Sequence, residues 1–347
     1  MQRRSFLLGL VFLEAGCMEQ QGLEWRSVRG DEVEGKGWAQ TAAPFDRLPE
    51  RAQATVPPAV WNLSRSSAGL CYRFVTASPQ IGVRWSVGGE LAMPHMPASG
   101  VSGVDLYGRG SDNKWRFIGV GQPRQQVGNQ VVFAGASGGL REFCLYLPLY
   151  NSTIRLELGC APGAAALPAP PRAHKPIVFY GTSITQGGCA SRPGMAFTAI
   201  AARTLDRPHL NLGFSGNGKM ELALAELLGE LDASVFVLDC LRNMSDELVR
   251  ERLEPFVRRL REKRPTTPIL CAGDAFLDNP KEPSRSKLTR EAVEKLTREG
   301  LPHLHYLPMR GAWGTDGEAT VDGVHPTDLG MSRQAEVFVK ALRKLIG

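Results

Sequence analysis

A serine and a histidine that lie far apart in the chain could form a nucleophile and its base. Ser183 follows the apolar run Ile177–Tyr180 in the segment Gly-Thr-Ser. A free serine hydroxyl is a weak nucleophile near neutral pH, so it needs a base. His325 lies three residues after Asp322, a spacing that can hold the carboxylate against one ring nitrogen. The other nitrogen is then free to take a proton from Ser183, as acyl transfer requires.

Two segments between this serine and histidine offer hydrogen-bond donors. The glycine-rich segment Asn211–Gly218 contains Gly216, and Asn243 closely follows the apolar run Val235–Asp239. Backbone N–H groups and an asparagine amide are the donors from which oxyanion holes are built. The same glycine-rich segment also contains Ser215, which is a competing candidate for the nucleophile.

These candidates all lie in loops of a predicted α/β domain at 173–347. Short apolar runs alternate there with helical patterns, which favours a parallel sheet covered by helices on both faces, with the chemistry at the carboxyl ends of the strands. The predicted strands are Ile177–Tyr180, His209–Leu212, Val235–Asp239, Ile269–Cys271 and His305–Leu307. The predicted helices are Ala196–Leu205, Lys219–Leu231, Asp246–Lys263, Ser286–Glu299 and Asp328–Ile346, the last with an N-cap at Thr327.

The part of the chain before this domain has a different pattern. Short apolar segments separated by turn residues predict an antiparallel β-sandwich over 38–160. A stretch rich in alanine and proline, 161–172, is typical of a linker. The predicted strands are Leu70–Thr76, Ile81–Val87, Trp115–Val120, Val131–Ala134, Phe143–Leu147 and Ile154–Leu158.

Ser, Gly, Asn and His in this order, each on its own loop, resemble the SGNH (GDSL-like) hydrolases. The resemblance implies a flavodoxin-like fold and needs no metal or organic cofactor. It makes Ser183 the nucleophile, His325 the base and Asp322 the residue that orients the base. It also makes Ser183, Gly216 and Asn243 the three oxyanion donors and leaves Ser215 without a catalytic role.

The sequence departs from the common family pattern at two motifs. Gly-Asp-Ser is replaced by Gly-Thr-Ser, and Gly-x-Asn-Asp by Leu-Arg-Asn-Met. Both replacements resemble a subgroup that carries an amino-terminal β-domain with a Gly-x-Asp-Leu-Tyr signature, here Gly103–Tyr107. Asp105 and Tyr107 then either stabilise a turn of the sheet or belong to a loop that shapes the substrate cleft. Arg242 either contacts a substrate carboxylate or pairs with an acidic side chain.

The resemblance implies a serine esterase, and an appended β-sandwich on an exported chain is similar to the arrangement in carbohydrate esterases. The expected substrate is therefore a short-chain, acetyl ester of a sugar or polysaccharide. A broad arylesterase or thioesterase and a lysophospholipase remain alternatives, as does an inactive carbohydrate-binding protein. The sequence identifies neither the sugar nor its acetylated position.

Composition and charge exclude several other classes of protein. The net charge of +6 is spread over both signs, for example in 250–263, so no nucleic-acid partner is expected. No apolar run is long enough for a transmembrane helix. Basic residues and then an apolar run within 1–17 predict a signal peptide and export, with Cys17 as a possible lipid anchor. The seven cysteines show no zinc-type spacing, and their pairing is left open.

Overall fold

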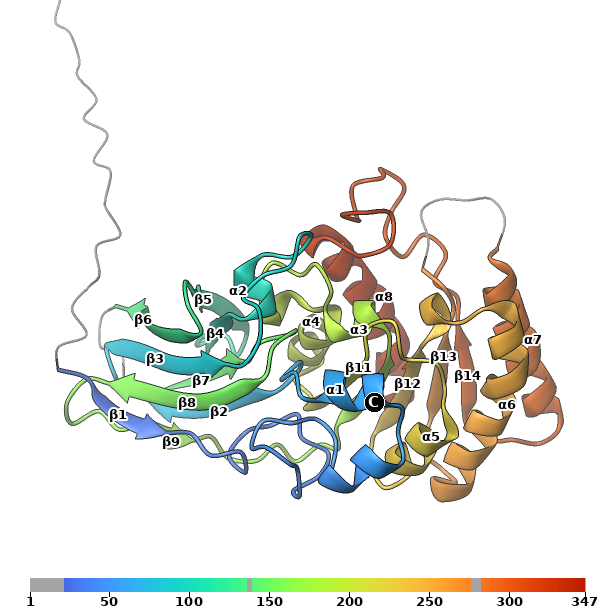
Figure 1. The fold of residues 1–347 in the computed structure, drawn as a ribbon, viewed down its shortest axis with the longest axis horizontal. Coiled ribbons are helices and arrows are strands. Elements are labelled where there is room, and N and C mark those ends of the chain that lie inside the picture. The colour runs from blue at the N-terminus through green and yellow to red at the C-terminus, as the bar shows by residue number, and fades with distance from the viewer. Residues whose placement is uncertain (1–21, 136–138, 276–281, 347) are drawn as a thin grey trace, which may run out of the picture.

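The structure is a computed structural model that describes residues 22–135, 139–275 and 282–346. The predicted signal peptide and Cys17 lie outside the described residues. Figure 1 shows a β-rich lobe built mostly from the first half of the chain and, beside it, a second lobe in which helices surround a sheet. No helix among the described residues is long and apolar enough to cross a membrane.

The second lobe is built on a parallel sheet of five strands in the order β11-β10-β12-β13-β14. Numbered within the lobe this order is 2-1-3-4-5, which is the flavodoxin-like arrangement. The fold class predicted from the sequence is therefore confirmed. The strands are β10 (Ile177–Gly181), β11 (His209–Gly213), β12 (Val235–Asp239), β13 (Ile269–Ala272) and β14 (Leu304–Leu307).

The central strand β10 is buried along its whole length, as a parallel strand covered on both faces must be. One face packs on α4 (Phe197–Leu205) and α8 (Asp328–Ile346), where Phe197 and Phe338 stack with ring centroids 5.0 Å apart. The other face packs on α5 (Leu222–Leu228), α6 (Asp246–Lys263) and α7 (Ser284–Arg298). The predicted N-cap of α8 is confirmed, since the Thr327 hydroxyl accepts a hydrogen bond of 3.3 Å from the backbone N–H of Gly330.

The first lobe contains two antiparallel sheets, in the orders β1-β8-β3-β6 and β5-β4-β7-β2-β9. Apolar side chains from both sheets form one shared core, and Trp85 within it donates a hydrogen bond of 2.9 Å to the carbonyl of Ser102. The predicted β-sandwich is confirmed. Its strands are β1 (Glu24–Ser27), β2 (Cys71–Thr76), β3 (Gln80–Val87), β4 (Val104–Arg109), β5 (Trp115–Gly121), β6 (Val127–Ala134), β7 (Arg141–Tyr146), β8 (Thr153–Cys160) and β9 (Leu167–Pro168).

The sandwich extends further along the chain at both ends than the expected bounds of 38–160. Strand β1 pairs with β8 although it lies before residue 38, and β9 pairs with β2 although it lies in the predicted linker. The Gly-x-Asp-Leu-Tyr signature forms most of β4, an inner strand of its sheet. Short edge strands such as β9 gain their stability from the neighbouring strand, so a local pattern does not reveal them.

Short helices lie between the two lobes. The 3₁₀ helix η1 (Glu50–Ala54) and α1 (Pro58–Ser64) add apolar side chains to the core beside α5 and α6. Helix α2 (Ala98–Val101) contacts η2 (Pro193–Met195), which precedes α4. The β-rich lobe therefore reaches the loops that follow the first strand of the parallel sheet.

Candidate active site

Ser183 lies at the first turn after the central parallel strand. Strand β10 ends at Gly181, and α3 (Ser183–Gln186) begins two residues later, with Thr182 as its N-cap. A Cβ atom on Gly181 would lie 2.1 Å from the hydroxyl oxygen of Thr185, so this tight turn requires glycine. The side chain of Ser183 is buried except for 6% of its surface.

A hydrogen-bonded chain joins this serine to a histidine and an aspartate. Ser183 Oγ lies 2.9 Å from Nε2 of His325, and Nδ1 of the same ring lies 2.7 Å from Oδ2 of Asp322. Oδ1 of Asp322 accepts hydrogen bonds from the backbone N–H groups of Val324 and His325, at 2.9 and 2.8 Å. The structure thus brings together the three residues that the sequence predicted as a catalytic set.

The aspartate of this set is held in its charged form. Partial burial disfavours the carboxylate, but the hydrogen bonds from His325 and Val324 outweigh it and lower the pKa of Asp322 to about 2. In a neutral imidazole, a carboxylate against one ring nitrogen holds the ring proton on that nitrogen and leaves the other nitrogen with its lone pair. Nε2 of His325 is then the atom that can accept the proton of Ser183.

Gly216 and Asn243 lie together beside this set. Gly216 has φ +70°, and a Cβ atom there would meet nothing within 4 Å, so its surroundings are open. When the Asn243 amide is assigned the orientation that gives both of its ends hydrogen-bond partners, its oxygen accepts from the backbone N–H groups of Asn217, Gly218 and Gly216, at 3.1, 3.2 and 3.3 Å. The NH₂ group of Asn243 is then left to face acceptors on the other side. The Gly216 N–H therefore already has a long contact to Asn243.

Hydrogen bonds with neighbouring side chains hold the turn at Ser183. The hydroxyl of Tyr150, from the end of the β-rich lobe, donates a hydrogen bond of 3.1 Å to the carbonyl of Ser183. Thr185 donates a hydrogen bond of 2.9 Å to Asp239 at the end of β12. Burial, with a further contribution from Asp274, raises the pKa of Asp239 to about 6.

An open cleft of about 460 Å³ lies at this site. Residues of both lobes line it, so the cleft exists only where the lobes meet. They are Ala59, Asn62, Leu63, Met93, His95, Tyr150, Ser215, Asn217 and His325.

Comparison with known proteins agrees with this geometry. Residues 174–343 match the GDSL-like lipase/acylhydrolase family, and residues 23–166 match the GxDLY family, the amino-terminal part of SGNH-hydrolase-type esterases. A GDSL-like lipase from Bacteroides ovatus shares 36% sequence identity and a TM-score of 0.85, over 93% of this chain and 98% of that one. The chain belongs to the SGNH (GDSL-like) hydrolase family. No curated protein matches it.

More distant solved structures share the two-lobed fold of this SGNH hydrolase. A salicylyl-acyltransferase from a tetracycline biosynthetic pathway has 20% identity and a TM-score of 0.74, over 94% of this chain and 97% of its own. A family two carbohydrate esterase from Clostridium thermocellum, in complex with cellohexaose, has 16% identity and a TM-score of 0.60, over 80% and 92%. At these identities the comparison concerns the fold alone.

Of the two alternatives that the sequence left open for Asp105 and Tyr107, the structure favours the structural one, and neither residue lines the cleft. Asp105 is fully buried, and its carboxylate accepts hydrogen bonds from Arg192 at 2.6 Å and from the backbone N–H of Gly194 at 2.9 Å. The Tyr107 hydroxyl accepts from Arg192 at 2.6 Å and from Arg203 at 3.2 Å. The signature of this SGNH hydrolase therefore fastens the β-rich lobe to the loop before α4.

Arg242 does not line the cleft either. It forms an ion pair of 3.3 Å with Asp274, which also pairs with Arg285, and its guanidinium lies 5.7 Å from the ring centre of Trp313. Of the two alternatives that the sequence left open, the structure shows the ion pair. The prediction that Arg242 binds substrate is not supported by its position.

Ser215, the competing nucleophile candidate, also lines the cleft. Its backbone N–H donates a hydrogen bond of 3.0 Å to the side chain of Gln186. Among the described residues, the hydrogen bond between a serine hydroxyl and a histidine ring is the one from Ser183. Position beside a base, rather than exposure to the cleft, distinguishes the two serines.

Sequence reasoning assigned no individual role to three residues of the site region. Arg47 is fully buried and donates hydrogen bonds to the carbonyls of Leu63, Ser66, Asn211 and Gly213, which joins the amino-terminal segment to the end of β11. His95 and Cys189 lie beside His325 and come from different lobes. Burial, with a further contribution from Asp322, raises the pKa of Cys189 to about 11, so its thiol keeps its proton at neutral pH.

Proposed function

We propose that this SGNH hydrolase is a serine esterase that removes short acyl groups, acetyl above all, from carbohydrate esters. The observation that carries the proposal is the chain of hydrogen bonds of 2.9 and 2.7 Å from Ser183 through His325 to Asp322. A positioned base next to a hydroxyl, with a third group orienting the base, is the arrangement that activates a serine nucleophile.

The first half of the reaction forms an acyl-enzyme. As the Ser183 hydroxyl gives its proton to Nε2 of His325, Oγ attacks the ester carbonyl and forms a C–O bond. The imidazolium that results is stabilised by the carboxylate of Asp322, which stays charged because of its low pKa. His325 then gives the proton to the leaving alcohol as the ester C–O bond breaks.

The second half of the reaction releases the acid. His325 takes a proton from a water molecule, whose oxygen attacks the acyl carbonyl, and the proton returns to Oγ as the carboxylic acid leaves. In both halves the carbonyl oxygen carries negative charge in the tetrahedral intermediate. Each oxyanion donor typically contributes about 2.7–4 kcal/mol to lowering the barrier.

Three donors are assigned to this oxyanion. The backbone N–H of Ser183 lies at the start of α3, where helix N–H groups have no intrahelical partner. The Asn243 amide presents its NH₂ away from the Gly216–Gly218 turn. The N–H of Gly216 already faces Asn243 at 3.3 Å, so its contribution requires that this long contact be exchanged for the substrate oxygen.

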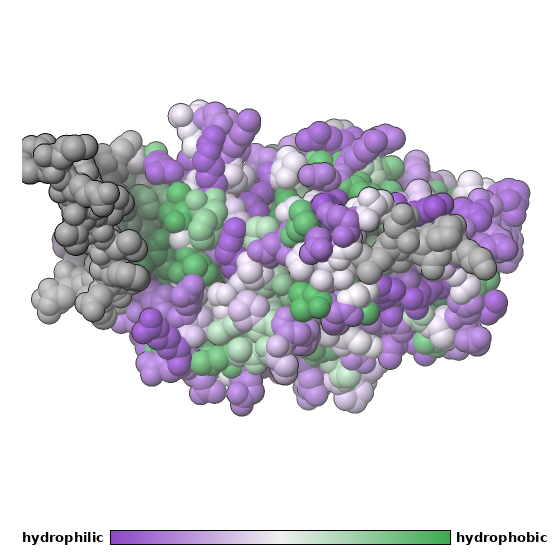
Figure 2. Space-filling view, turned by 90° about the horizontal axis from the view of Figure 1, so that it is seen from above, coloured by the Kyte–Doolittle hydropathy of each residue, from purple (hydrophilic) through white to green (hydrophobic). Residues whose placement is uncertain are grey.

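The surroundings of the site favour a small acyl group on a polar alcohol. The cleft is open and is lined by polar side chains such as Asn62, His95 and Asn217 together with the larger apolar groups of Leu63, Met93 and Tyr150. Figure 2 shows hydrophilic residues interspersed with smaller hydrophobic groups over the described part of one face. The same fold occurs in a carbohydrate esterase solved in complex with cellohexaose, so the fold is compatible with an enzyme that acts on carbohydrate.

Initial rates of the full chain on p-nitrophenyl acetate, butyrate and octanoate, beside Ser183→Ala, test the proposal. We expect fast acetate hydrolysis that declines with acyl length and is lost in the variant. A rate that stays constant or rises with acyl length, and that is lost in the variant, would indicate a broad esterase or thioesterase without a preference for acetyl groups. If the wild type and Ser183→Ala are equally slow but still bind oligosaccharides, the chain is a carbohydrate-binding protein and not an esterase. Acetylated xylan and acetylated mannan then serve to test the carbohydrate part directly.

A further inference from the structure

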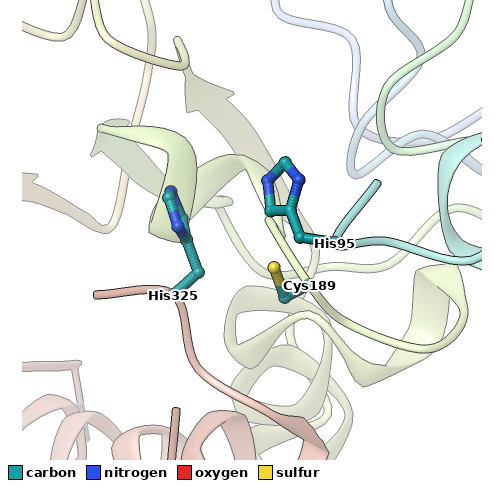
Figure 3. A group of neighbouring side chains, drawn as sticks. All are labelled: His95, Cys189 and His325. Atoms are coloured by element: carbon teal, nitrogen blue, oxygen red, sulfur yellow. The ribbon is translucent and has the colours of Figure 1, made fainter. Parts of the chain in front are cut away.

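A second set of side chains surrounds the catalytic histidine. His95 from the β-rich lobe, Cys189 from the loop after α3 and His325 each present a ligand atom, and these three atoms lie within 4.8 Å of one another. Figure 3 shows the two imidazole rings on opposite sides, with the sulfur of Cys189 pointing into the space between them. The ring centres of His95 and His325 are 5.5 Å apart.

The backbone holds Cys189 in this place at a conformational cost. Its φ is +69°, a region that residues other than glycine adopt uncommonly. The preceding residue, Gly188, donates a backbone hydrogen bond of 2.8 Å to the carbonyl of Ser183, which ties the loop to the nucleophile turn. Such strain persists only where the surrounding structure maintains it, and it is often found at functional sites.

His95, the third side chain of the set, belongs to a segment of the β-rich lobe that is hydrogen-bonded to the loop containing Cys189. His95 lies between Met93 and Met96, whose backbone groups exchange hydrogen bonds of 3.0 and 3.1 Å. A few residues further on, the Ser99 hydroxyl donates a hydrogen bond of 2.6 Å to the carbonyl of Ser191, two residues after Cys189. His95 itself is exposed and can adjust its side-chain torsions.

Two imidazoles and one thiol form a ligand set that suits zinc. Zinc binds cysteine sulfur at about 2.3 Å and histidine nitrogen at about 2.0–2.1 Å, usually in tetrahedral geometry. Tetrahedral ligand atoms at those lengths are about 3.3–3.6 Å apart. Closing the present separations therefore takes a movement of about 1 Å, which rotation of the exposed His95 can supply. Magnesium and calcium prefer oxygen ligands, so this set discriminates against them.

A metal ion at this site would bind the same ring nitrogen of His325 that Ser183 needs. Nδ1 faces the carboxylate of Asp322 at 2.7 Å, so Nε2 is the atom that can bind a metal. Zinc-binding histidines usually donate their other ring N–H to a carboxylate or carbonyl, as this one does. Nε2 is also the atom 2.9 Å from Ser183 Oγ, and one lone pair cannot serve both partners.

We propose that His95, Cys189 and His325 form an inhibitory zinc site, in which bound Zn²⁺ occupies Nε2 of His325 and deprives Ser183 of its base. Binding involves no redox step: the thiol of Cys189 releases one proton to solvent, the two imidazoles donate their lone pairs, and water completes the coordination. The inhibitory part of this inference rests on the proposed esterase function, whereas the binding part does not.

Binding is measured first, without reference to activity. The full chain, freed of metal by a chelator, is titrated with Co²⁺, whose absorption reports both tetrahedral geometry and a thiolate ligand, and Zn²⁺ is then used to displace it. We expect one ion per chain and a thiolate-to-cobalt absorption band. Cys189→Ser should abolish the band, and His95→Ala should weaken zinc binding by more than about 10-fold. Cys160→Ser and His174→Ala, which remove the same residue types elsewhere in the chain, should change neither.

Inhibition is measured second, with the same proteins and p-nitrophenyl acetate. Zinc should inhibit the wild type over the concentration range in which it displaces cobalt, a chelator should restore the rate, and Cys189→Ser should need at least about 10-fold more zinc. Absence of the cobalt band, or zinc inhibition that is unchanged in both Cys189→Ser and His95→Ala, would overturn the proposal. If the chain proves inactive on esters, the cobalt titration still decides whether the site exists, and Ser183→Ala should bind cobalt at least as tightly as the wild type.

Discussion

Ser183 and its neighbours lie inside the parallel-sheet lobe, whereas Asp322 and His325 lie on a loop whose own hydrogen bonds hold it. Ser183 is 6% exposed, and Thr185 and Gln186 in the same turn are fully buried. The Asp322 side chain is 41% exposed and that of His325 is 22% exposed. In the loop, the Val321 N–H donates to the carbonyl of His325 at 2.8 Å. The nucleophile is therefore positioned by the core and the base by local geometry.

This difference indicates how each half of the site tolerates change. A side chain that contacts the nucleophile turn is coupled to the packing of the sheet, so a substitution there acts on the whole lobe. The loop that carries Asp322 and His325, here called the base loop, can open with little loss of buried surface. A substitution in it should therefore change the catalytic rate with little effect on global stability. The four predictions below test this distinction.

The largest effect is expected at the aspartate of the base loop. Asp322→Asn keeps the size of the side chain but loses the charge that orients the imidazole and stabilises its protonated form. We expect kcat to fall on the order of 10⁴-fold, as in other hydrolases of this mechanism, with only a small decrease in the urea unfolding midpoint because the carboxylate is partly exposed. A fall of less than about 10-fold would show that another group orients His325.

The second effect is on stability and concerns the core half of the site. Because burial raises the pKa of Asp239 to about 6, the folded state retains a proton that the unfolded state loses near its ordinary pKa of about 4. The contribution of Asp239 to wild-type stability should therefore fall as pH rises from about 4 to about 6, by up to roughly 3 kcal/mol. Asp239→Asn removes this titration while its amide oxygen still accepts the hydrogen bond from Thr185.

Urea unfolding of both proteins at pH 4, 5 and 7 measures this contribution. The free energy of unfolding of Asp239→Asn should exceed that of the wild type at pH 7, and the difference should shrink toward pH 4. A difference that is constant over this range would show that Asp239 titrates normally in the folded protein.

The third effect is expected at the contact between the two halves. A Cβ atom on Gly188 would lie 3.3 Å from Cδ2 of His325, 3.1 Å from the carbonyl oxygen of Ser183 and 3.0 Å from the hydroxyl of Tyr150. Gly188→Ala should displace the imidazole by a fraction of an ångström and lower kcat about 10- to 100-fold, with a smaller change in KM.

Gly89→Ala is the matched control for this variant. Its Cβ atom would lie 3.1 Å from Oδ1 of Asn151, a comparable contact, and Gly89 does not line the catalytic cleft. We expect Gly89→Ala to retain the wild-type kcat. An equal loss in both variants would attribute the effect of Gly188→Ala to general destabilisation.

The smallest effect is expected within the base loop. Gly323 has φ +83°, and a Cβ atom there would meet nothing within 4 Å, so Gly323→Ala introduces backbone strain without a clash. Strain of about 1 kcal/mol should lower kcat/KM by roughly 5-fold, because a smaller fraction of the molecules then holds the loop in the active geometry. The unfolding midpoint should not change, and a shift of several degrees in Tm would contradict the local character of the loop.

Much of the site could be predicted because each member belongs to a local pattern. Ser183, Gly216 and Asn243 follow strands whose apolar runs are continuous, and the carboxyl ends of parallel strands meet at one edge. Asp322 and His325 are close in sequence, so their contact needs only one turn of the chain. The order of the five strands then follows from the family fold.

Contacts between the lobes could not be predicted in the same way. From the sequence, Asp105 and Tyr107 could belong either to a turn of the sheet or to the substrate cleft. Only their hydrogen bonds to Arg192, formed where β4 packs against the loop before α4, show that they are structural. His95 and Cys189 are almost a hundred residues apart, and metal-ligand rules based on spacing do not detect such pairs. Their proximity depends on how two separately folded cores pack together.

Covalent labelling tests the central claim, that His325 activates Ser183, most directly. The full chain is treated with a fluorophosphonate, which phosphonylates an activated serine, and the modified peptide is identified by mass spectrometry. The account predicts one label per chain on Ser183, with labelling slowed at least about 10³-fold in His325→Ala. A label on Ser215, or labelling of Ser183 at an unchanged rate in His325→Ala, would contradict it.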